Sequence, residues 1–371
     1  MTSSYRQQTN WLRYQPFFPE AMRCDEESAP EESWWRWNGL EVHLDRLKNP
    51  AAPLKAIVLH GAGAYGRVMA PAAVLAQRHG YETVAPDLPG YGLTQVPWRR
   101  FEYQLWIDCV VDLIAEEQRR DSRPIVLFGV SLGGLLAYQA AARSGRVAGL
   151  IASTLADTRE DAVRRDFART PLLGSVGIKL LERLSFLTDN LPLPMAHMSK
   201  MHAISNIPEL SALCSRDPLG GGNWVPARFL RSLMHAVPDV EPEAFELCPV
   251  LVVHPGEDRM TDIAHSRRFF GRLPGEKRFV VLDGASHMPT EQPGTQQMQD
   301  AVLRFLGDIA ARNSTSSARA ELFWRLKCSA IAANACACSS ARAASAAWGR
   351  KSVVHTTLHC SPSGITSSTA L

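Results

Sequence analysis

The sequence predicts an α/β fold whose central twisted sheet is mostly parallel and flanked by helices. Short apolar runs alternate with helical patterns, as where 56–60 is followed by a helical stretch over about 67–79. Continuous apolar strands that alternate with helices are typical of βαβ units, in which both faces of the sheet are buried. A second observation is that this alternation breaks only once, over about 157–246, and then resumes. The sequence therefore predicts one sheet with a single helical insertion after its sixth strand.

The first elements are predicted by a turn signal. Asn38-Gly39 stands between two β-prone runs, and a type I′ hairpin turn needs a positive φ at both of its central residues. After the turn, Leu40, Val42 and Leu44 alternate with polar residues, as in a half-buried strand. We therefore expect a hairpin over 34–44.

The later elements follow from the alternation itself. Each expected strand is a short apolar run, and each expected helix is the helical pattern that follows such a run. The expected strands are 56–60, 83–85, 125–128, 147–151, 250–253 and 278–282, and the expected helices are about 67–79, 101–120, a helix from 132, 261–272 and 296–311.

The domain organisation is predicted from changes in composition. The first residues are polar and dotted with proline, which indicates a loose arm, and the last are rich in Ala, Ser and Cys, which indicates disorder with a short helix near 319–335. The expected parts are an N-terminal arm (1–33), a core in two pieces (34–156 and 247–312), a helical cap (157–246) and a mostly disordered tail (313–371).

The composition excludes several classes of protein. The chain has 371 residues, 46% of them hydrophobic, and a net charge of 40 − 37 = +3, too weak and dispersed for a nucleic-acid partner. It contains no apolar run of about 18 residues, and its polar N-terminus lacks the apolar core of a signal peptide. None of its eight cysteines forms a C-x-x-C pair. We therefore expect a cytoplasmic protein with reduced thiols and no transmembrane segment, and the oligomeric state stays open.

The segment Gly129-Val130-Ser131-Leu132-Gly133 fits the pattern G-x-S-x-G. An expected strand runs into it and a helical pattern leaves it, which is the context of a nucleophile elbow. In so tight a turn, side chains two residues either side of the serine would clash, and glycine removes them. The N-terminus of the following helix favours an oxyanion beside the serine. We therefore expect Ser131 to be a nucleophile, with a plain turn and an incidental serine as the structural alternative.

A serine hydroxyl needs a base, and in this architecture the base follows both the serine and the acid in the chain. His287 comes directly after the expected strand 278–282, at the edge of the sheet where ligands bind in open α/β sheets. His254 would share its strand end with the loop of the acid, and His265 falls on a helical pattern. His287 is therefore the expected base.

The base in turn needs a carboxylate to orient it. Asp258 lies in the loop after the expected strand 250–253 and is the expected acid. Glu257, Asp262 and Asp157 are the rivals, and Asp157 is a real second option because it follows an earlier strand.

The tetrahedral intermediate needs two N–H donors. One is expected from Leu132, the residue after the nucleophile, and the other from the glycine-rich loop that follows the strand 56–60. Within that loop we expect the N–H of Ala62, although an ordinary glycine turn would look the same.

Five motifs follow one another along the chain: His60-Gly61-Ala62-Gly63, Asp87-Leu88-Pro89-Gly90-Tyr91-Gly92, Gly129-Val130-Ser131-Leu132-Gly133-Gly134, Gly256-Glu257-Asp258-Arg259 and Gly284-Ala285-Ser286-His287. Together, in this order, they resemble the α/β-hydrolase superfamily, and within it the serine hydrolases related to monoacylglycerol lipases and lysophospholipases. The resemblance covers about 35–312 and implies Ser131 as nucleophile, Asp258 as acid, His287 as base, and Leu132 with Ala62 as oxyanion-hole amides. It implies no cofactor, and the serine nucleophile disfavours dehalogenase and epoxide hydrolase chemistry.

The expected function is that of a serine hydrolase that cleaves a carboxylic ester with a lipid-like or otherwise apolar acyl group. A carbon–carbon or amide hydrolase (aminopeptidase-like), an acyltransferase and a non-catalytic ligand-binding protein are the alternatives. No metal is expected, because the spacing of His197, His202 and His235 fits no zinc pattern. Apolar residues of the expected cap would suit an acyl chain or merely pack its core. They are Phe186, Leu187, Leu191, Leu193, Met195, Met198, Met201 and Trp224.

Overall fold

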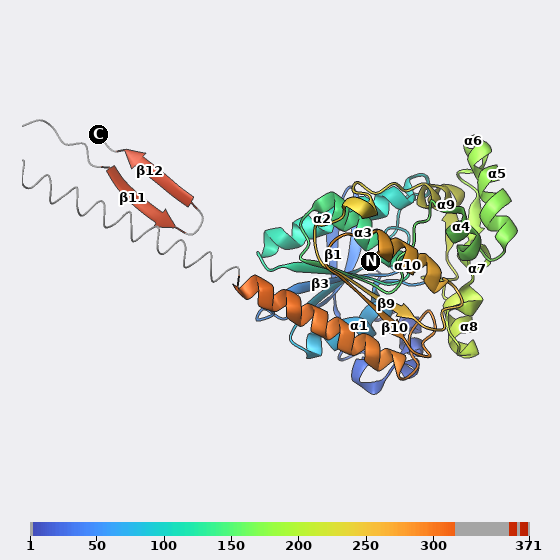
Figure 1. Cartoon of the computed structure of the whole chain (residues 1–371), viewed down its shortest axis with the longest axis horizontal. Coiled ribbons are helices and arrows are strands. Elements are labelled where there is room, and N and C mark those ends of the chain that lie inside the picture. The colour runs from blue at the N-terminus through green and yellow to red at the C-terminus, as the bar shows by residue number, and fades with distance from the viewer. Residues whose placement is uncertain (1–2, 316–355, 362–363, 370–371) are drawn as a thin grey trace, which may run out of the picture. The chain divides into compact units, whose positions relative to one another are not determined.

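The computed structural model of the chain describes residues 3–315, 356–361 and 364–369 (Figure 1). It divides into two compact units, 1–313 and 314–371. The first unit holds the whole of the predicted core.

The core is an eight-stranded sheet in the order β1-β2-β4-β3-β5-β6-β9-β10. β2 is antiparallel to both of its neighbours, β1 and β4. All neighbouring pairs from β4 to β10 are parallel. The predicted α/β fold with a mostly parallel sheet is therefore confirmed. The strands are β1 (Glu31–Trp37), β2 (Leu40–Leu47), β3 (Lys55–Leu59), β4 (Glu82–Pro86), β5 (Ile125–Gly129), β6 (Gly149–Ala152), β9 (Val250–Pro255) and β10 (Lys277–Leu282).

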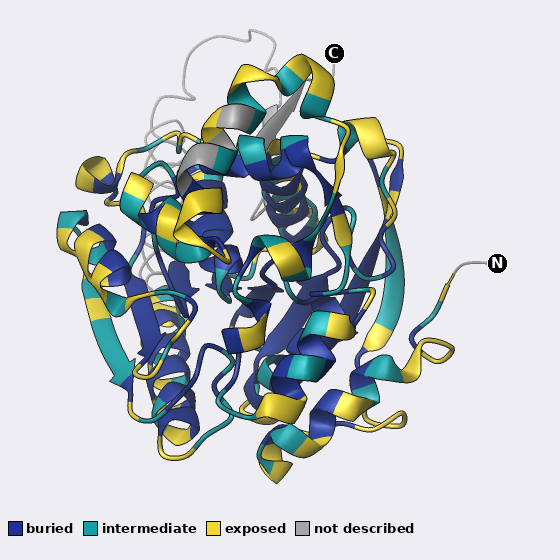
Figure 2. Ribbon diagram, turned by 90° about the vertical axis from the view of Figure 1, so that its right-hand side faces the viewer, coloured by how far each residue is buried: buried dark blue, intermediate teal, exposed yellow. Residues whose placement is uncertain are grey.

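Helices cover both faces of this sheet. α2 and α3 lie on one face, and α1 and the helix over 294–315 lie on the other (Figure 1). Buried residues are concentrated in the sheet and on the sides of the helices that face it (Figure 2). The helices of the core are α1 (Ala70–Arg78), α2 (Tyr103–Arg120), α3 (Leu132–Ser144), α10 (Ile263–Arg272) and 294–315.

The predicted hairpin is present. Trp37 pairs with Leu40 across the turn, and Asn38 and Gly39 have φ values of 48° and 72°. Two positive φ values in succession are what a type I′ turn requires. The first strand starts at Glu31, three residues before the expected range.

The insertion stands where the alternation of strands and helices breaks, between β6 and β9, and it follows the sixth strand as predicted. It is not wholly helical, because β7 and β8 pair antiparallel within it. Its helices gather at one end of the unit (Figure 1). Its elements are α4 (Asp161–Phe167), α5 (Ile178–Arg183), α6 (Ser185–Thr188), β7 (Pro192–Pro194), α7 (Met195–Met198), α8 (Pro208–Arg216), β8 (Trp224–Pro226) and α9 (Ala227–Met234).

The N-terminal segment, residues 3–30, differs from the expected loose arm. Its short helices η1 (Thr9–Phe17) and η2 (Glu20–Met22) pack on the core. Tyr5, Trp11 and Tyr14 are each only 1% exposed. The segment is polar in its average composition, so composition alone did not predict the burial of these three aromatic residues. Their large apolar surfaces favour burial whatever their neighbours are.

Buried hydrogen bonds hold the N-terminal segment in place. The Tyr5 hydroxyl donates to Asp87 Oδ2 at 2.7 Å, and the Tyr14 hydroxyl donates to Asp217 Oδ2 at 2.9 Å. Asp87 follows β4, and Asp217 lies in the insertion. The segment therefore bonds to both the core and the insertion.

The second unit contains two described strands, β11 (Thr356–Ser361) and β12 (Gly364–Thr369), which pair antiparallel. The expected short helix near 319–335 lies outside the described residues, as do most of the other positions for which disorder was expected. In the described part of the chain, no helix combines the length and the apolar character that crossing a membrane requires.

Candidate active site

Ser131 stands at the turn between β5 and α3, where the sequence places it. Its φ of 56° and ψ of −126° lie in a region that residues other than glycine rarely adopt. A Cβ added at Gly129 would collide with the Gly133 carbonyl, and one added at Gly133 would collide with the Leu59 carbonyl. The close approach of these backbones is thus the reason for both glycines of the motif.

Two hydrogen bonds join Ser131, His287 and Asp258. His287 Nε2 lies 2.7 Å from Ser131 Oγ, and His287 Nδ1 lies 2.7 Å from Asp258 Oδ2. The side chains of His287 and Asp258 are 4% and 1% exposed. The structure therefore brings the three predicted residues together across 156 positions of sequence.

Asp258 is held as a carboxylate. Burial alone would raise its pKa, but the adjacent His287 and the N–H of Thr261 outweigh burial, and the net pKa lies below the ordinary 3.8. Its Oδ1 accepts hydrogen bonds from the N–H groups of Met260 and Thr261, at 2.8 and 2.9 Å. The second oxygen is thereby left for His287.

The rival acids have other partners. Glu257 accepts a hydrogen bond from Asn206, and Asp262 caps the N-terminus of α10 by accepting from the N–H of Ala264. Asp157 pairs with Arg159 and Arg272. Each rival is thus accounted for by a local interaction away from His287.

The rival histidines are placed as expected. His254 is buried near the end of β9, where its Nδ1 lies 2.9 Å from the Pro255 carbonyl oxygen. His265 is on α10, where its Nε2 lies 3.4 Å from Asp166. Neither is bonded to Ser131.

The glycine-rich loop after β3 lies against the turn that carries Ser131. A Cβ on Gly61 would stand 3.0 Å from Ser131 Cβ and 3.3 Å from the nitrogen of Leu132. Within residues 3–315, no backbone carbonyl accepts a hydrogen bond from the N–H of Ala62 or of Leu132. The two predicted donors are therefore both near Ser131 and unused by the backbone.

His60 fixes this loop and was not singled out for that role from the sequence. The N–H of Leu88 donates to His60 Nε2 at 3.0 Å, so the ring's proton is on Nδ1, which lies 2.8 Å from the Gly61 carbonyl. Complete burial lowers the pKa of His60 from 6.5 to about 4, although the Gly61 bond and the charge of Asp87 act in the opposite direction. The ring is therefore neutral in the folded protein at neutral pH.

This lowered pKa makes stability depend on pH. Between 6.5 and 4 the unfolded chain binds a proton at His60 that the folded chain does not, so stability is lost as the pH falls through this window. From pH 7 to pH 5, the free energy of unfolding should fall by about 2 kcal/mol more in the wild type than in His60→Gln. Urea unfolding of both proteins at the two pH values measures this difference, and equal losses would contradict it.

The pocket beside Ser131 is small and apolar, with a volume of about 80 Å³. No carboxylate or lysine lines it among the described residues. The N-terminal segment contributes Phe18 and Met22 to its wall, and the last core helix contributes Met298. These three residues were missed because nothing in a single sequence indicates which distant segments meet at Ser131.

The apolar residues proposed for the insertion lie mostly elsewhere. Of the eight, only Met201 lines the Ser131 pocket, where it is joined by Phe167 and Ile204. Leu193 and Met198 line a separate apolar cavity inside the insertion. Phe186, Leu187, Leu191 and Trp224 are 48–81% exposed, so these four fit neither of the two alternatives, an acyl site or a packed core of the insertion.

A second, smaller hollow adjoins the apolar pocket at Ser131, Leu132 and Phe167. Its wall includes Thr158, Asp166 and Thr261, together with His265. Asp166 is ion-paired with Lys200 at 2.5 Å. Two spaces therefore meet at Ser131, and the second has more polar side chains in its wall than the first.

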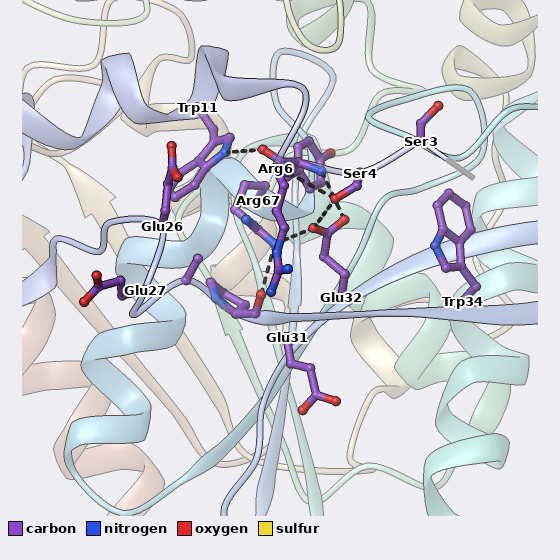
Figure 3. Close-up of a pocket in the computed structure, with 13 residues that line it drawn as sticks. Ser3, Ser4, Arg6, Trp11, Glu26, Glu27, Glu31, Glu32, Trp34 and Arg67 are labelled. Carbon is purple, nitrogen blue, oxygen red and sulfur yellow. Dashed lines mark hydrogen bonds and ion pairs between the residues drawn. The ribbon is translucent and has the colours of Figure 1, made fainter. Parts of the chain in front are cut away.

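A hollow of about 460 Å³ lies apart from this site, between the N-terminal segment and β1 (Figure 3). Arg67 crosses it, paired with Asp45 and stacked on the rings of Tyr5 and Trp11 at 4.8 and 4.9 Å. Ser4 Oγ donates to Glu32 there at 2.8 Å. These contacts anchor the N-terminal segment, and none of them involves Ser131. Among the described residues, no group of three or more His, Cys, Asp or Glu is arranged to hold a metal ion.

Known proteins resemble this chain in sequence and in fold. Phospholipase YtpA of Bacillus subtilis is 25% identical over 277 residues, covering 73% of this chain and 98% of that protein. The monoglyceride lipase of Saccharomyces cerevisiae, solved as a soluble variant with a substrate analogue, superposes with a TM-score of 0.63 at 14% identity, covering 79% and 98% of the two chains. The monoacylglycerol lipase of Paleococcus ferrophilus gives 0.60 at 22% identity, covering 72% and 99%. The two solved structures establish the fold.

The family assignment comes from the sequence. Residues 52–293 match the family described as serine aminopeptidase, S33. This match covers more than half of the chain, and it confirms the expected resemblance to serine hydrolases and the expectation of an enzyme. The chain therefore belongs to the serine aminopeptidase S33 family, within the α/β-hydrolase superfamily.

Proposed function

We propose that this protein is a serine hydrolase that cleaves carboxylic esters with an apolar acyl group. The observation that carries the proposal is the run of two 2.7 Å hydrogen bonds from Ser131 Oγ through His287 to Asp258, at the wall of an apolar pocket. The relatives include a phospholipase and two monoacylglycerol lipases, names that favour lipid-like esters as the substrate class here.

In the first half of the reaction, Ser131 Oγ attacks the ester carbonyl carbon while His287 Nε2 takes the hydroxyl proton. Asp258 holds the imidazole in the tautomer that presents Nε2 to the serine, and it stabilises the imidazolium that forms. The oxygen that becomes negative lies toward the N–H groups of Leu132 and Ala62. The alcohol then leaves with the proton from His287, and the acyl group stays on Ser131.

In the second half, water replaces the alcohol. His287 Nε2 takes a proton from the water as its oxygen attacks the acyl carbon, and the same two N–H groups again face the oxyanion. His287 returns the proton to Ser131 Oγ as the carboxylic acid is released. An acyltransferase would differ only in the acceptor, an alcohol in place of water. The insertion would act as a cap over this site, because three of its side chains, Phe167, Met201 and Ile204, line the pocket.

An ester fits the site better than the α-amino group of a peptide. An aminopeptidase must hold an ammonium group near the serine, which requires an unpaired carboxylate there. Asp217 accepts from two tyrosines, whereas Asp239 and Glu241 pair with arginines. Glu209, a fourth acid that could serve in an aminopeptidase, is exposed at the start of α8 and lines neither the Ser131 pocket nor the hollow beside it. Asp166, the one carboxylate among the described residues that line these two spaces, is paired with Lys200. No unpaired carboxylate of the described residues therefore lines the space around the serine.

A series of p-nitrophenyl esters from acetate to palmitate tests the proposed function. We expect turnover of the shorter and medium members, with a burst of p-nitrophenol equal to the enzyme concentration if deacylation is the slower step. Mass spectrometry of the quenched enzyme should find the acyl group on Ser131. Fluorophosphonate labelling at Ser131 without turnover of any ester would favour amide or carbon–carbon cleavage, and absence of both would favour a binding protein.

A further inference from the structure

Four side chains separate the Ser131 pocket from a second apolar cavity. Met22, Ala72, Phe128 and Met298 line both spaces. The second cavity has a volume of only about 10 Å³. The rest of its wall is apolar and comes from β3, β6, α1 and the last core helix. The inner end of the pocket is thus an apolar partition with a very small cavity behind it.

The partition has two fixed members and two adjustable ones. Phe128 is held in β5 by its backbone ladder, and Ala72 has no side-chain torsion to change. Met22 and Met298 are unbranched, with three rotatable bonds each, so they fill an irregular gap without fixing its shape. Both are buried, at 1% and 7% exposure. The length of the pocket therefore depends on two methionines.

These methionines come from the two ends of the unit. Met22 ends η2 in the N-terminal segment, and Met298 is in the helix over 294–315. Gln299 Nε2, one residue from Met298, lies 3.2 Å from Met22 Sδ. Both methionines lie outside residues 52–293, the range that matches the family. The two adjustable members of the partition thus lie beyond the family match, whereas Ala72 and Phe128 lie within it.

Polarity indicates which part of a substrate would reach the partition. The hollow that shares Ser131 with this pocket has Thr158, Asp166 and Thr261 in its wall, side chains that can bond to an alcohol. The wall of the pocket that ends at the two methionines is apolar except for Ser131, Ser153 and His287, and it suits hydrocarbon. An ester bound with its carbonyl at Ser131 would therefore direct its acyl chain toward Met22 and Met298.

We propose that Met22 and Met298 form the end wall of the acyl site and set the longest acyl chain that the enzyme accepts. The proposal rests on the proposed function. It assigns a specificity-determining role to the N-terminal segment, which reaches the acyl chain through Met22. Shortening either methionine would join the pocket to the cavity behind it, and esters with longer straight chains would then fit.

The test compares kcat/KM for two p-nitrophenyl esters, the longest that the wild type accepts and the one two methylenes longer. In Met22→Ala the longer-to-shorter ratio should rise by roughly tenfold, since each additional methylene accommodated by an apolar site contributes at least that much discrimination. Met298→Ala should act in the same direction. Met22→Leu keeps the volume of the side chain, so it should leave the ratio within about twofold of wild type.

Phe17→Ala is the matched control for damage to the N-terminal segment. Phe17 packs against the core from the same segment, but it does not line the pocket. An unchanged ratio in Met22→Ala, or an equal rise in Phe17→Ala, would overturn the proposal while the hydrolase assignment stands. If Met22→Ala does not fold, the same kcat/KM ratio is measured in Met298→Ala. A rise there supports the proposal, and an unchanged ratio overturns it. Ester turnover that persists in Ser131→Ala would instead overturn the proposed function, and the acyl-wall inference with it.

Discussion

Replacing Ser131 with alanine should abolish ester hydrolysis, lowering kcat on the order of 10⁶-fold, as found when the nucleophile of a serine protease is removed. Without Oγ no acyl-enzyme forms, and His287 Nε2 loses the hydroxyl that lies 2.7 Å away. The oxyanion donors and the pocket remain, so a residual rate of about 10³-fold over the uncatalysed reaction is compatible with the mechanism.

The measurement pairs p-nitrophenyl ester turnover with fluorophosphonate labelling. Wild type should label and the alanine variant should not, and circular dichroism should report the same fold for both. Ser215→Ala is a matched control, because Ser215 lies on α8, outside the pocket, and its hydroxyl donates only to a backbone carbonyl. Equal labelling of wild type and Ser131→Ala would place the nucleophile elsewhere.

Asp258→Asn should lower kcat by about 10⁴-fold with little effect on the fold. An amide donates where the carboxylate accepts, so the His287 ring would be held in the tautomer that carries its proton on Nε2 and could no longer accept the proton of Ser131. The two N–H groups that bond Asp258 Oδ1 can still bond the amide oxygen, which keeps the loop in place.

Two control variants make this second result specific. Glu257→Gln changes the neighbouring residue, whose side chain contacts Asn206, and it should leave turnover within about twofold because surface changes of this kind have small effects. Asp157→Asn should reduce stability by breaking the pairs with Arg159 and Arg272, but it should not change kcat of the folded enzyme. Near-normal turnover in Asp258→Asn would remove Asp258 from the mechanism.

The sequence was most informative where backbone chemistry dictates residue type. The hairpin at Asn38-Gly39, the glycines around Ser131 and the strand ends that carry Asp258 and His287 are local constraints, visible in a few neighbouring residues. The order of strands and helices then fixes which loops meet at the same edge of a parallel sheet. For this reason the spatial meeting of Ser131, Asp258 and His287 could be anticipated, while their catalytic roles remain a proposal for experiment.

The lining of the pocket could not be anticipated in the same way. The apolar insertion residues Phe186 and Trp224 have the composition of an acyl site but are exposed, whereas Met22 sits in a polar stretch and is buried. Burial of such residues is decided by tertiary packing between distant segments, which neither periodicity nor composition encodes.

The contact between Met22 and Gln299 spans 277 positions of the chain. Closing so long a loop has an entropic cost that must be met before the contact can stabilise anything, and contacts of high sequence separation tend to slow folding. Ser131, Asp258 and His287, by contrast, follow β5, β9 and β10 of one sheet, and they are at most 156 positions apart. During folding, these three residues can thus be brought together before the far end of the pocket is sealed. Selectivity for the acyl chain should accordingly be acquired later in folding than reactivity itself, and it should be the first property lost when the two ends of this unit loosen.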